Sequence, residues 1–342
     1  MLDYRLLDWK LIGAVLTLSV IGVILIMAAQ HHDTSEYARN YYLRQLLWLG
    51  IALVFATIVL HLPFRLFDAG AYVLYAVAVI LLVAVLFFGT VRMGAMRWFS
   101  FGPVNLSPAD IGKISLIFVL ARFFAYTRLS PTSKRRLAMS LMLAVVPMML
   151  VLKQPDLGTS LSFPVILAAL WFWSGLPLYF LALIASPFLS LVAASHWLAW
   201  SIYIAVLLAA LILAKPGLAF GVVTVVMNLA FGSITPFIWN KLEDYQKLRI
   251  ISFIDPSQDP RGAGYQIIQS KIAIGSGGLW GKGFLGGSQT KLDFLPERHT
   301  DFIFSVLGEE FGLWVALIVI GLFAYMFYRG IRTAARSRSR FL

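Results

Sequence analysis

Residues 255–284 read DPSQDPRGAGYQIIQSKIAIGSGGLWGKGF, and residues 295–312 read LPERHTDFIFSVLGEEFG. Both stretches are polar, charged and rich in glycine. In the whole 342-residue chain, by contrast, hydrophobic residues make up 60% and charged residues only 13%. A soluble domain of this size does not have that composition, so we predict an all-α, polytopic membrane protein interrupted by one long polar segment.

The apolar part of the chain divides into about ten runs, each near the ~20 residues that a helix needs to cross a bilayer. No internal repeat or low-complexity segment separates them, which predicts a single membrane domain over residues 1–342. The predicted spans are 10–29, 43–62, 69–90, 108–126, 137–153, 159–175, 177–194, 197–214, 218–238 and 302–328.

The formal net charge of +12 is distributed unequally along the chain. When the N-terminus is placed in the cytoplasm and the spans alternate, nearly all of this net charge falls on the inner side. This positive-inside pattern accounts for the basic composition without nucleic-acid binding. The chain has no cysteine, so disulfides and thiol catalysis are excluded.

The same topology places a long loop, residues 237–301, outside the cytoplasm. Loops of this length in compact proteins are usually functional. Within it, Ile267 to Ile274 alternate well enough to predict a short amphipathic helix at the membrane surface. The glycines from Gly275 to Gly287 do not have the spacing of a phosphate-binding P-loop. Their simplest interpretation is a flexible re-entrant turn.

Asp301 is the candidate catalytic residue, because it stands at the mouth of the last predicted span. Partial desolvation of a carboxylate there raises its pKa and makes it a stronger proton acceptor. An equal alternative from the residues alone is that Thr300 or Asp301 only caps the following helix.

Further acids surround this position. Glu309 and Glu310 lie two turns into the span, where charge is expensive, so at least one is expected to face a polar cavity or to pair with a base. Glu297 and Arg298 could form a surface ion pair and nothing more.

Arg97, Lys113 and Arg249 supply positive charge on the outer side of the predicted topology. A diphosphate group needs such fixed charge, and guanidinium groups suit its oxygens. The alternative for Lys113 is a side chain that snorkels to the interface or pairs with Asp110.

A second short polar island, KQPDLGT at residues 153–159, joins two apolar runs at the outer face. Asp156 could contribute to the same cavity as the cations, or it could form only a cap and turn with Thr159.

Seven motifs occur in order along residues 43–330: GAMRW, SPADIGK, QPDLGT, YQKLR, DPSQDPRGAGYQ, IGSGGLWGKG and LPERHTDFIF. In sequence and order they resemble the motifs of the SEDS family (shape, elongation, division and sporulation), and the long loop is closer to the RodA branch than to the FtsW branch. The resemblance implies a peptidoglycan glycosyltransferase of the bacterial cytoplasmic (inner) membrane. Such an enzyme polymerises lipid II into glycan strands during cell elongation and releases undecaprenyl diphosphate.

The resemblance also implies roles for particular residues. Asp301 matches the proposed general base, while Arg97, Lys113 and Asp156 match residues implicated in handling lipid II. The implied partners are a class B penicillin-binding protein and the elongation machinery. No metal ligand or cofactor is assigned, and a divalent cation such as Mg²⁺ or Mn²⁺ is left open. The candidate substrate-binding residues are Arg97, Lys113, Asp156, Arg249, Lys282, Glu297, His299 and Thr300.

Two departures from the family pattern are expected. Residues 177–214 are interpreted as a two-helix insertion, which preserves the side on which the long loop lies. The family's last two helices are expected to be missing from this chain.

Three functions remain open from the sequence. The first is glycan polymerisation with Asp301 as the base. The second is a lipid II transporter (flippase), since broken spans and buried charges are also features of transporters. The third is a non-catalytic scaffold for a penicillin-binding protein.

Overall fold

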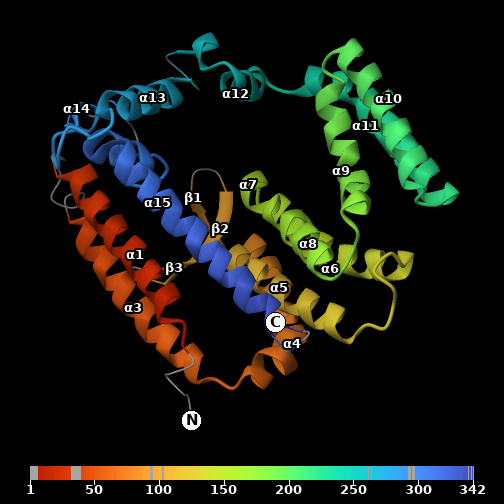
Figure 1. Ribbon diagram of the computed structural model, residues 1–342, viewed down its shortest axis with the longest axis horizontal. Helices are drawn as coiled ribbons and strands as arrows, with labels where there is room; N and C mark the ends of the chain where they lie inside the picture. Colours follow the sequence, from red (N-terminus) through yellow and green to blue (C-terminus); the bar gives the residue numbers. More distant parts are fainter. Residues whose placement is uncertain are drawn as a thin grey trace. The chain divides into compact units, whose positions relative to one another are not determined.

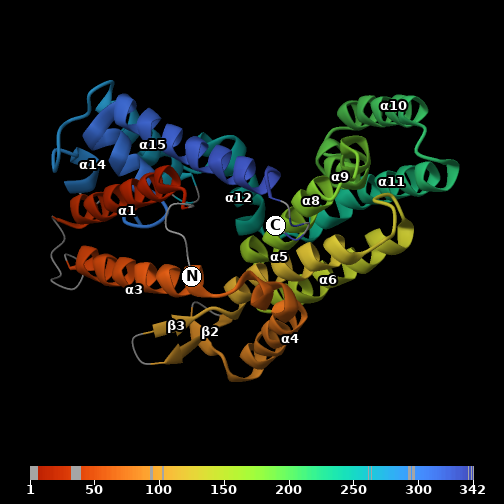
Figure 2. The same ribbon diagram turned by 60° about the horizontal axis from the view of Figure 1, so that its bottom comes forward.

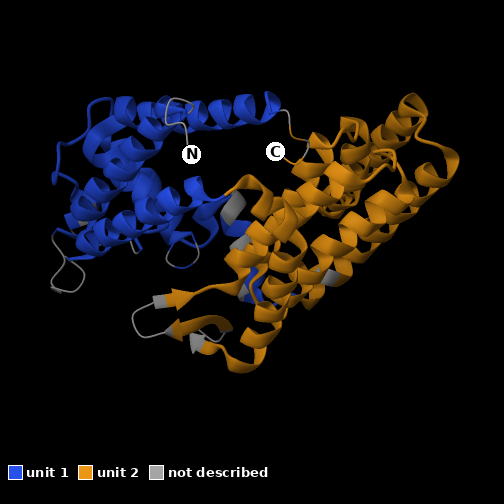
Figure 3. Ribbon diagram, turned by 90° about the horizontal axis from the view of Figure 1, so that it is seen from below, with its two compact units in different colours: residues 1–62, 242–337 blue, residues 63–241, 338–342 orange. Residues whose placement is uncertain are grey.

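The chain folds into two compact units in the computed structural model (Figure 3). The first unit contains Met1–Leu62 and Leu242–Ser337, and the second contains Pro63–Lys241 and Arg338–Leu342. We describe each unit by itself. The structure describes residues 7–31, 40–92, 95–101, 104–260, 262, 264–291, 294, 297–337, 339 and 341.

The first unit brings the first and the last helix of the chain together. Helix α15 packs against α1 and against α13 from the long loop (Figure 1). The N-cap of α1 is Asp8, which accepts a hydrogen bond from the Leu11 backbone N–H at 3.2 Å and another from Arg329 Nε at 2.7 Å. The elements of this unit are α1 (Trp9–Gln30), α3 (Tyr41–His61), α12 (Asp244–Ile254), the 3₁₀ turn η2 (Pro256–Gln258), α13 (Tyr265–Gly277), α14 (Ser288–Lys291) and α15 (Ile303–Ala335).

The second unit is a helical bundle with a small sheet. Its core contains Leu82, Leu116, Phe163 and Leu167, all buried. The sheet contacts α4 and α5 (Figure 2). The elements are α4 (Phe64–Phe88), β1 (Thr90–Arg92), β2 (Ala95–Phe101), β3 (Val104–Leu106), α5 (Pro108–Tyr126), α6 (Lys134–Leu152), α7 (Leu157–Ser160), α8 (Ser162–Trp173), α9 (Leu178–Ala193), α10 (Trp197–Ala214) and α11 (Leu218–Lys241).

The three strands were not predicted from the sequence. They pair antiparallel in the order β1-β2-β3, with Thr90 opposite Trp98 and Phe99 opposite Leu106. They form where the sequence predicts only an outer loop between two spans. Aromatic residues along β2 favour a strand, and this element gives Arg97 a fixed place.

A helix lies over every predicted span, so the all-α polytopic fold is confirmed apart from the sheet. Among the described residues, seven helices are long and apolar enough to cross a membrane, and two shorter apolar stretches, Leu157–Trp173 and Leu178–Ala193, accompany them. The number of ten spans stays a prediction.

Buried hydrogen bonds join the helices at residues 177–214 to α11. Asn228 is fully buried, and its Nδ2 donates to Ser186 Oγ at 2.7 Å, while Tyr203 Oη donates to Asn228 Oδ1 at 2.9 Å. Polar side chains that bond across helices stabilise packing in an apolar environment. These bonds integrate α9 and α10 into the unit, and their origin as an insertion stays a prediction.

Helix α15 is broken, whereas the sequence predicts one continuous span. Gly312 adopts φ 77° and ψ −173°, which is not helical. The backbone N–H groups of Lys282 and Gly283 donate to the carbonyls of Glu309 and Glu310, both at 2.9 Å. Beyond the break, the Leu313 N–H donates at 3.0 Å and the Trp314 N–H at 3.4 Å, to the carbonyls of Gly278 and Leu279 respectively. The glycine-rich loop therefore satisfies the backbone groups that the break leaves unpaired.

Candidate active site

Asp301 closes a short turn that precedes α15. The Glu297 carbonyl accepts hydrogen bonds from the Thr300 N–H at 3.2 Å and from the Phe302 N–H at 3.3 Å. The Thr300 hydroxyl lies 3.3 Å from the Glu297 carboxylate and donates to it. The N-cap of α15 is Phe302, which makes no side-chain capping bond. The alternative that Thr300 or Asp301 caps this helix is therefore wrong.

The Asp301 side chain is exposed. Within the part of the chain that the structure describes, no hydrogen bond or ion pair engages its carboxylate. The predicted partial desolvation is thus not observed in the first unit. An ionised carboxylate without such partners keeps both oxygens available to accept a proton. This is the property that a general base requires.

The turn that carries Asp301 is attached to α1 and α3 by its own side chains. Arg298 is only 6% exposed, and its Nε donates to the Ala29 carbonyl at 2.6 Å. The His299 ring lies 5.1 Å from the Tyr41 ring, centroid to centroid. The interpretation of Arg298 as half of a surface ion pair is wrong, because the side chain is buried. It fixes the position of the turn instead.

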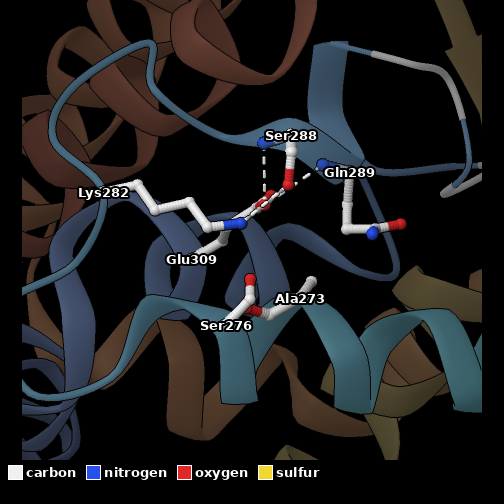
Figure 4. Close-up of polar contacts among 6 residues, drawn as sticks. All are labelled: Ala273, Ser276, Lys282, Ser288, Gln289 and Glu309. Carbon is white, nitrogen blue, oxygen red and sulfur yellow. Dashed lines mark hydrogen bonds and ion pairs between the residues drawn. The ribbon is translucent and has the colours of Figure 1, made fainter.

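Glu309 is the centre of a buried polar cluster (Figure 4). Its side chain has no exposed surface, and its Oε1 accepts hydrogen bonds from Lys282 Nζ at 2.7 Å and from the Ser288 N–H at 2.8 Å. The Ser288 hydroxyl at 3.0 Å and the Gln289 N–H at 3.1 Å donate to the same oxygen. The expectation that one of the two acids of the span pairs with a base is confirmed.

Glu310 is buried beside it at 1% exposed. Its Oε2 accepts a hydrogen bond from the Leu285 N–H at 3.1 Å. Glu310 thus receives a backbone N–H group from the loop between α13 and α14, and Glu309 receives two from the start of α14. Sequence reasoning found the acids but not these donors, because backbone donors leave no signature in the pattern of side chains.

Glycines at the end of α13 and in the loop after it serve close packing. A Cβ at Gly281 would lie 2.5 Å from the Glu310 carbonyl carbon, and a Cβ at Gly277 would lie 2.9 Å from the Glu309 Cα. Gly281 also has φ 77°, which side chains disfavour. The interpretation of these glycines as a flexible turn is wrong, because the loop backbone lies directly against α15. The predicted helix at Ile267 to Ile274 is confirmed within α13.

In the second unit, β2 and the start of α7 bring Arg97 and Asp156 together. Arg97 Nη1 lies 3.8 Å from Asp156 Oδ2, and Arg97 Nε donates to the Gln154 carbonyl at 3.2 Å. Its Nη2 donates to the Pro155 carbonyl. Asp156 caps α7 by accepting from the Thr159 N–H at 3.1 Å and the Thr159 hydroxyl at 2.9 Å. The predicted cap and turn at Asp156 are confirmed. Arg97 also binds this turn, through the Gln154 and Pro155 carbonyls.

The other two candidate cations, Lys113 and Arg249, belong to different units. Lys113 Nζ pairs with Asp110 at 2.7 Å one turn earlier on α5, as the alternative for this lysine predicts. Arg249 belongs to α12 in the first unit, and its side chain lies outside the described residues.

Gln154 is a polar residue beside this pair that the sequence did not single out. It is buried, and its Nε2 has no hydrogen-bond partner among the described residues. It lies next to the Arg97 and Asp156 pair through its own carbonyl. The described residues contain no group of three His, Asp or Glu side chains placed to hold a metal ion.

Known proteins resemble this chain over nearly its whole length. The family model of FtsW, RodA and SpoVE, described as "Cell cycle protein", matches residues 7–203 and 198–342. The peptidoglycan glycosyltransferase MrdB of Escherichia coli K12 is 38% identical over 336 residues, which cover 98% of this chain and 78% of MrdB. The peptidoglycan glycosyltransferase RodA of Treponema pallidum is 29% identical over 94% of this chain and 80% of its own length.

Two solved structures have the same fold. A chain from a structure described as "Structural coordination of polymerization and crosslinking by a peptidoglycan synthase complex" superimposes with a TM-score of 0.65 at 26% identity, covering 99% of this chain and 81% of that one. The rod shape determining protein RodA of Thermus thermophilus gives a TM-score of 0.59 at 21% identity, covering 99% and 78%. The chain therefore belongs to the FtsW/RodA/SpoVE family of multi-pass membrane proteins, the SEDS family.

Proposed function

We propose that this chain is a peptidoglycan glycosyltransferase that polymerises lipid II, with Asp301 as the general base. Membership of a family whose relatives are peptidoglycan glycosyltransferases supports the reaction class. The observation that carries the role of Asp301 is its place in the first unit. The carboxylate is exposed and does not cap α15, while the turn that holds it is attached through the buried Arg298. A fixed backbone with an available carboxylate suits proton abstraction.

The reaction follows from this role. Asp301 removes the proton from the 4-hydroxyl of the acceptor sugar as its oxygen attacks the anomeric carbon of the donor. The new glycosidic C–O bond forms while the bond from that carbon to the diphosphate oxygen breaks. The proton stays on Asp301, and undecaprenyl diphosphate leaves with the electron pair. Attack opposite the leaving group inverts the anomeric centre.

The second unit would supply charge for the diphosphate. Arg97 is held by two backbone carbonyls and faces Asp156 at 3.8 Å, a separation too long for a tight hydrogen-bonded ion pair. Its guanidinium therefore keeps donors for phosphate oxygens. Lys113 is our second candidate for binding the diphosphate. Its ammonium group would give up the ion pair with Asp110 when the substrate binds. Developing negative charge on a leaving group is stabilised by such preorganised donors.

The proposed location is the bacterial cytoplasmic membrane, with the N-terminus inside and the long loop outside, as the charge asymmetry of the sequence suggests. The proposed partner is a class B penicillin-binding protein, which would cross-link the glycan. Support comes from the similar chain of the peptidoglycan synthase complex, whose description joins polymerisation with crosslinking.

Asp301→Asn tests the proposal, with Asp244→Asn on α12 as the control because the Asp244 side chain is 97% exposed. Each purified protein is incubated with its penicillin-binding protein and labelled lipid II, and polymer is separated on a gel. We expect Asp301→Asn to make no polymer while its thermal unfolding matches the control.

Normal polymer from Asp301→Asn would refute the role of the base. Movement of labelled lipid II between liposome leaflets by the unmodified protein, with no polymer formed, would support the transporter instead.

A further inference from the structure

The Lys282 and Glu309 pair joins the loop after α13 to the helix that follows Asp301. Four donors converge on a single oxygen of Glu309, and three of them belong to Ser288 and Gln289. Lys282 Nζ also donates to Ser288 Oγ at 2.7 Å. Because Glu309 is fully buried, its charge needs this compensation, and the cluster is a strongly specified contact.

This cluster fixes one end of the segment that carries Asp301. At Gln289 the chain is attached to α15 through Glu309, and at Phe302 it enters α15 itself. Both ends of the segment from Gln289 to Phe302 are therefore tied to the same helix. Arg298 adds a third attachment, to α1.

The ammonium group of Lys282 is mostly occupied inside the protein. Its side chain is 27% exposed, and two of its three N–H donors are directed to Glu309 and Ser288. A lysine that binds a diphosphate would have to leave the buried Glu309 without its cation. That loss is strongly unfavourable for a carboxylate with no exposed surface.

We propose that Lys282 and Glu309 are positioning residues, which anchor α14 to α15 and so hold the turn at residues 297–302 where Asp301 meets the acceptor hydroxyl, and that Lys282 does not bind the substrate. The proposal rests on the proposed role of Asp301. It assigns Lys282 a different role from the substrate contact that the sequence suggests.

Kinetics provides the first test. Lys282→Met, Glu309→Gln and the double variant are compared with Lys271→Met, which removes an exposed lysine from α13. A displacement of about 1 Å can slow catalysis on the order of 100-fold, so kcat should fall at least about tenfold in both single variants. The KM for lipid II should stay within about twofold of the value for the unmodified protein, since the variants lose no contact with the substrate. The double variant should be no slower than the slower single variant, because the two side chains act as one unit.

A distance measurement tests the geometry without activity. The chain has no native cysteine, so Asp301→Cys with Ile318→Cys gives two unique spin-label sites in the first unit, on the turn and on the exposed face of α15. The distribution of distances between the labels should broaden when Lys282→Met is added. It should stay unchanged when Lys271→Met is added.

The outcomes separate the two proposals. A broadened distribution with a lower kcat supports the positioning role. An unchanged distribution with a raised KM would overturn it and make Lys282 a substrate contact. A broadened distribution with an unchanged kcat would confirm that the pair holds the turn, and would overturn both its catalytic consequence and the assignment of Asp301 as the base. If Glu309→Gln does not fold, Ser288→Ala removes one hydroxyl from the cluster and should give a smaller change in the same direction.

Discussion

Gly312→Ala is expected to destabilise the first compact unit strongly, because two separate penalties act at this residue. Its φ of 77° and ψ of −173° lie in a region that is essentially reserved for glycine, where another residue is strained by about 1–3 kcal/mol. A Cβ would also lie 2.6 Å from the Leu279 carbonyl oxygen and 2.7 Å from the Trp280 carbonyl carbon. Overpacking of this kind typically adds about 1–3 kcal/mol. Together they predict a loss of at least about 2 kcal/mol of unfolding free energy.

Gly321→Ala on the same helix is the matched control. A Cβ at Gly321 would have open space around it. Removing a glycine from the interior of a helix stabilises by roughly 0.5–1 kcal/mol. Unfolding in mixed micelles at increasing SDS fraction measures both variants against the unmodified protein. If Gly312→Ala proves as stable as Gly321→Ala, the helix break and the loop packed into it are refuted.

Two further predictions concern charge. In steady-state assays, Arg97→Ala and Lys113→Ala should each raise the KM for lipid II about tenfold or more, as expected when a charged hydrogen bond to substrate is lost. Replacing the exposed Arg128 with Ala should leave the KM unchanged. Equal effects of all three substitutions would indicate a general charge effect. Hydrogen bonding from Arg329 lowers the pKa of the Asp8 carboxyl below its ordinary value of 3.8. The stabilising contribution of Asp8 is therefore complete above pH 3.8 and is lost as the pH falls further. In thermal unfolding at a series of pH values, Asp8→Asn should lose the part of the stability that disappears in acid. If the stability of Asp8→Asn falls in acid as much as that of the unmodified protein, the pairing is contradicted.

Hydropathy predicted the helices well because the bilayer imposes a minimum apolar length on each span. The predicted spans all correspond to helices, and the ends differ by only a few residues at α1 and α10. Hydropathy could not find the break at Gly312, because a single glycine between apolar residues hardly changes the average. The small sheet was missed for a related reason, since its strands are only a few residues long and lie in a loop.

The candidate site was predicted in part. An acid at the start of the last helix, and an acid further along that needs a basic partner, were both visible in the sequence. The identity of that partner was not, because Lys282 and Glu309 meet only when the loop backbone enters the break in α15. The alternative of a cap at Asp301 failed because the turn places Phe302 between it and the helix. Local preferences could not decide this, since both residues before Phe302 are good cap formers.

The glycine cluster, the break at Gly312 and the buried acids form one structural solution. A break within an apolar helix exposes carbonyl and N–H groups that lipid cannot satisfy. At Gly281 the loop backbone lies so close to α15 that a Cβ would be 2.5 Å from the Glu310 carbonyl carbon, whereas Gly278 and Gly283 adopt positive φ values of 58° and 90°, which favour glycine. Once that loop lies in the break, its next residues reach Glu309, and the buried carboxylate gains the donors it needs. The charge within α15 therefore becomes tolerable because of the break, and the same contacts determine where the turn with Asp301 begins.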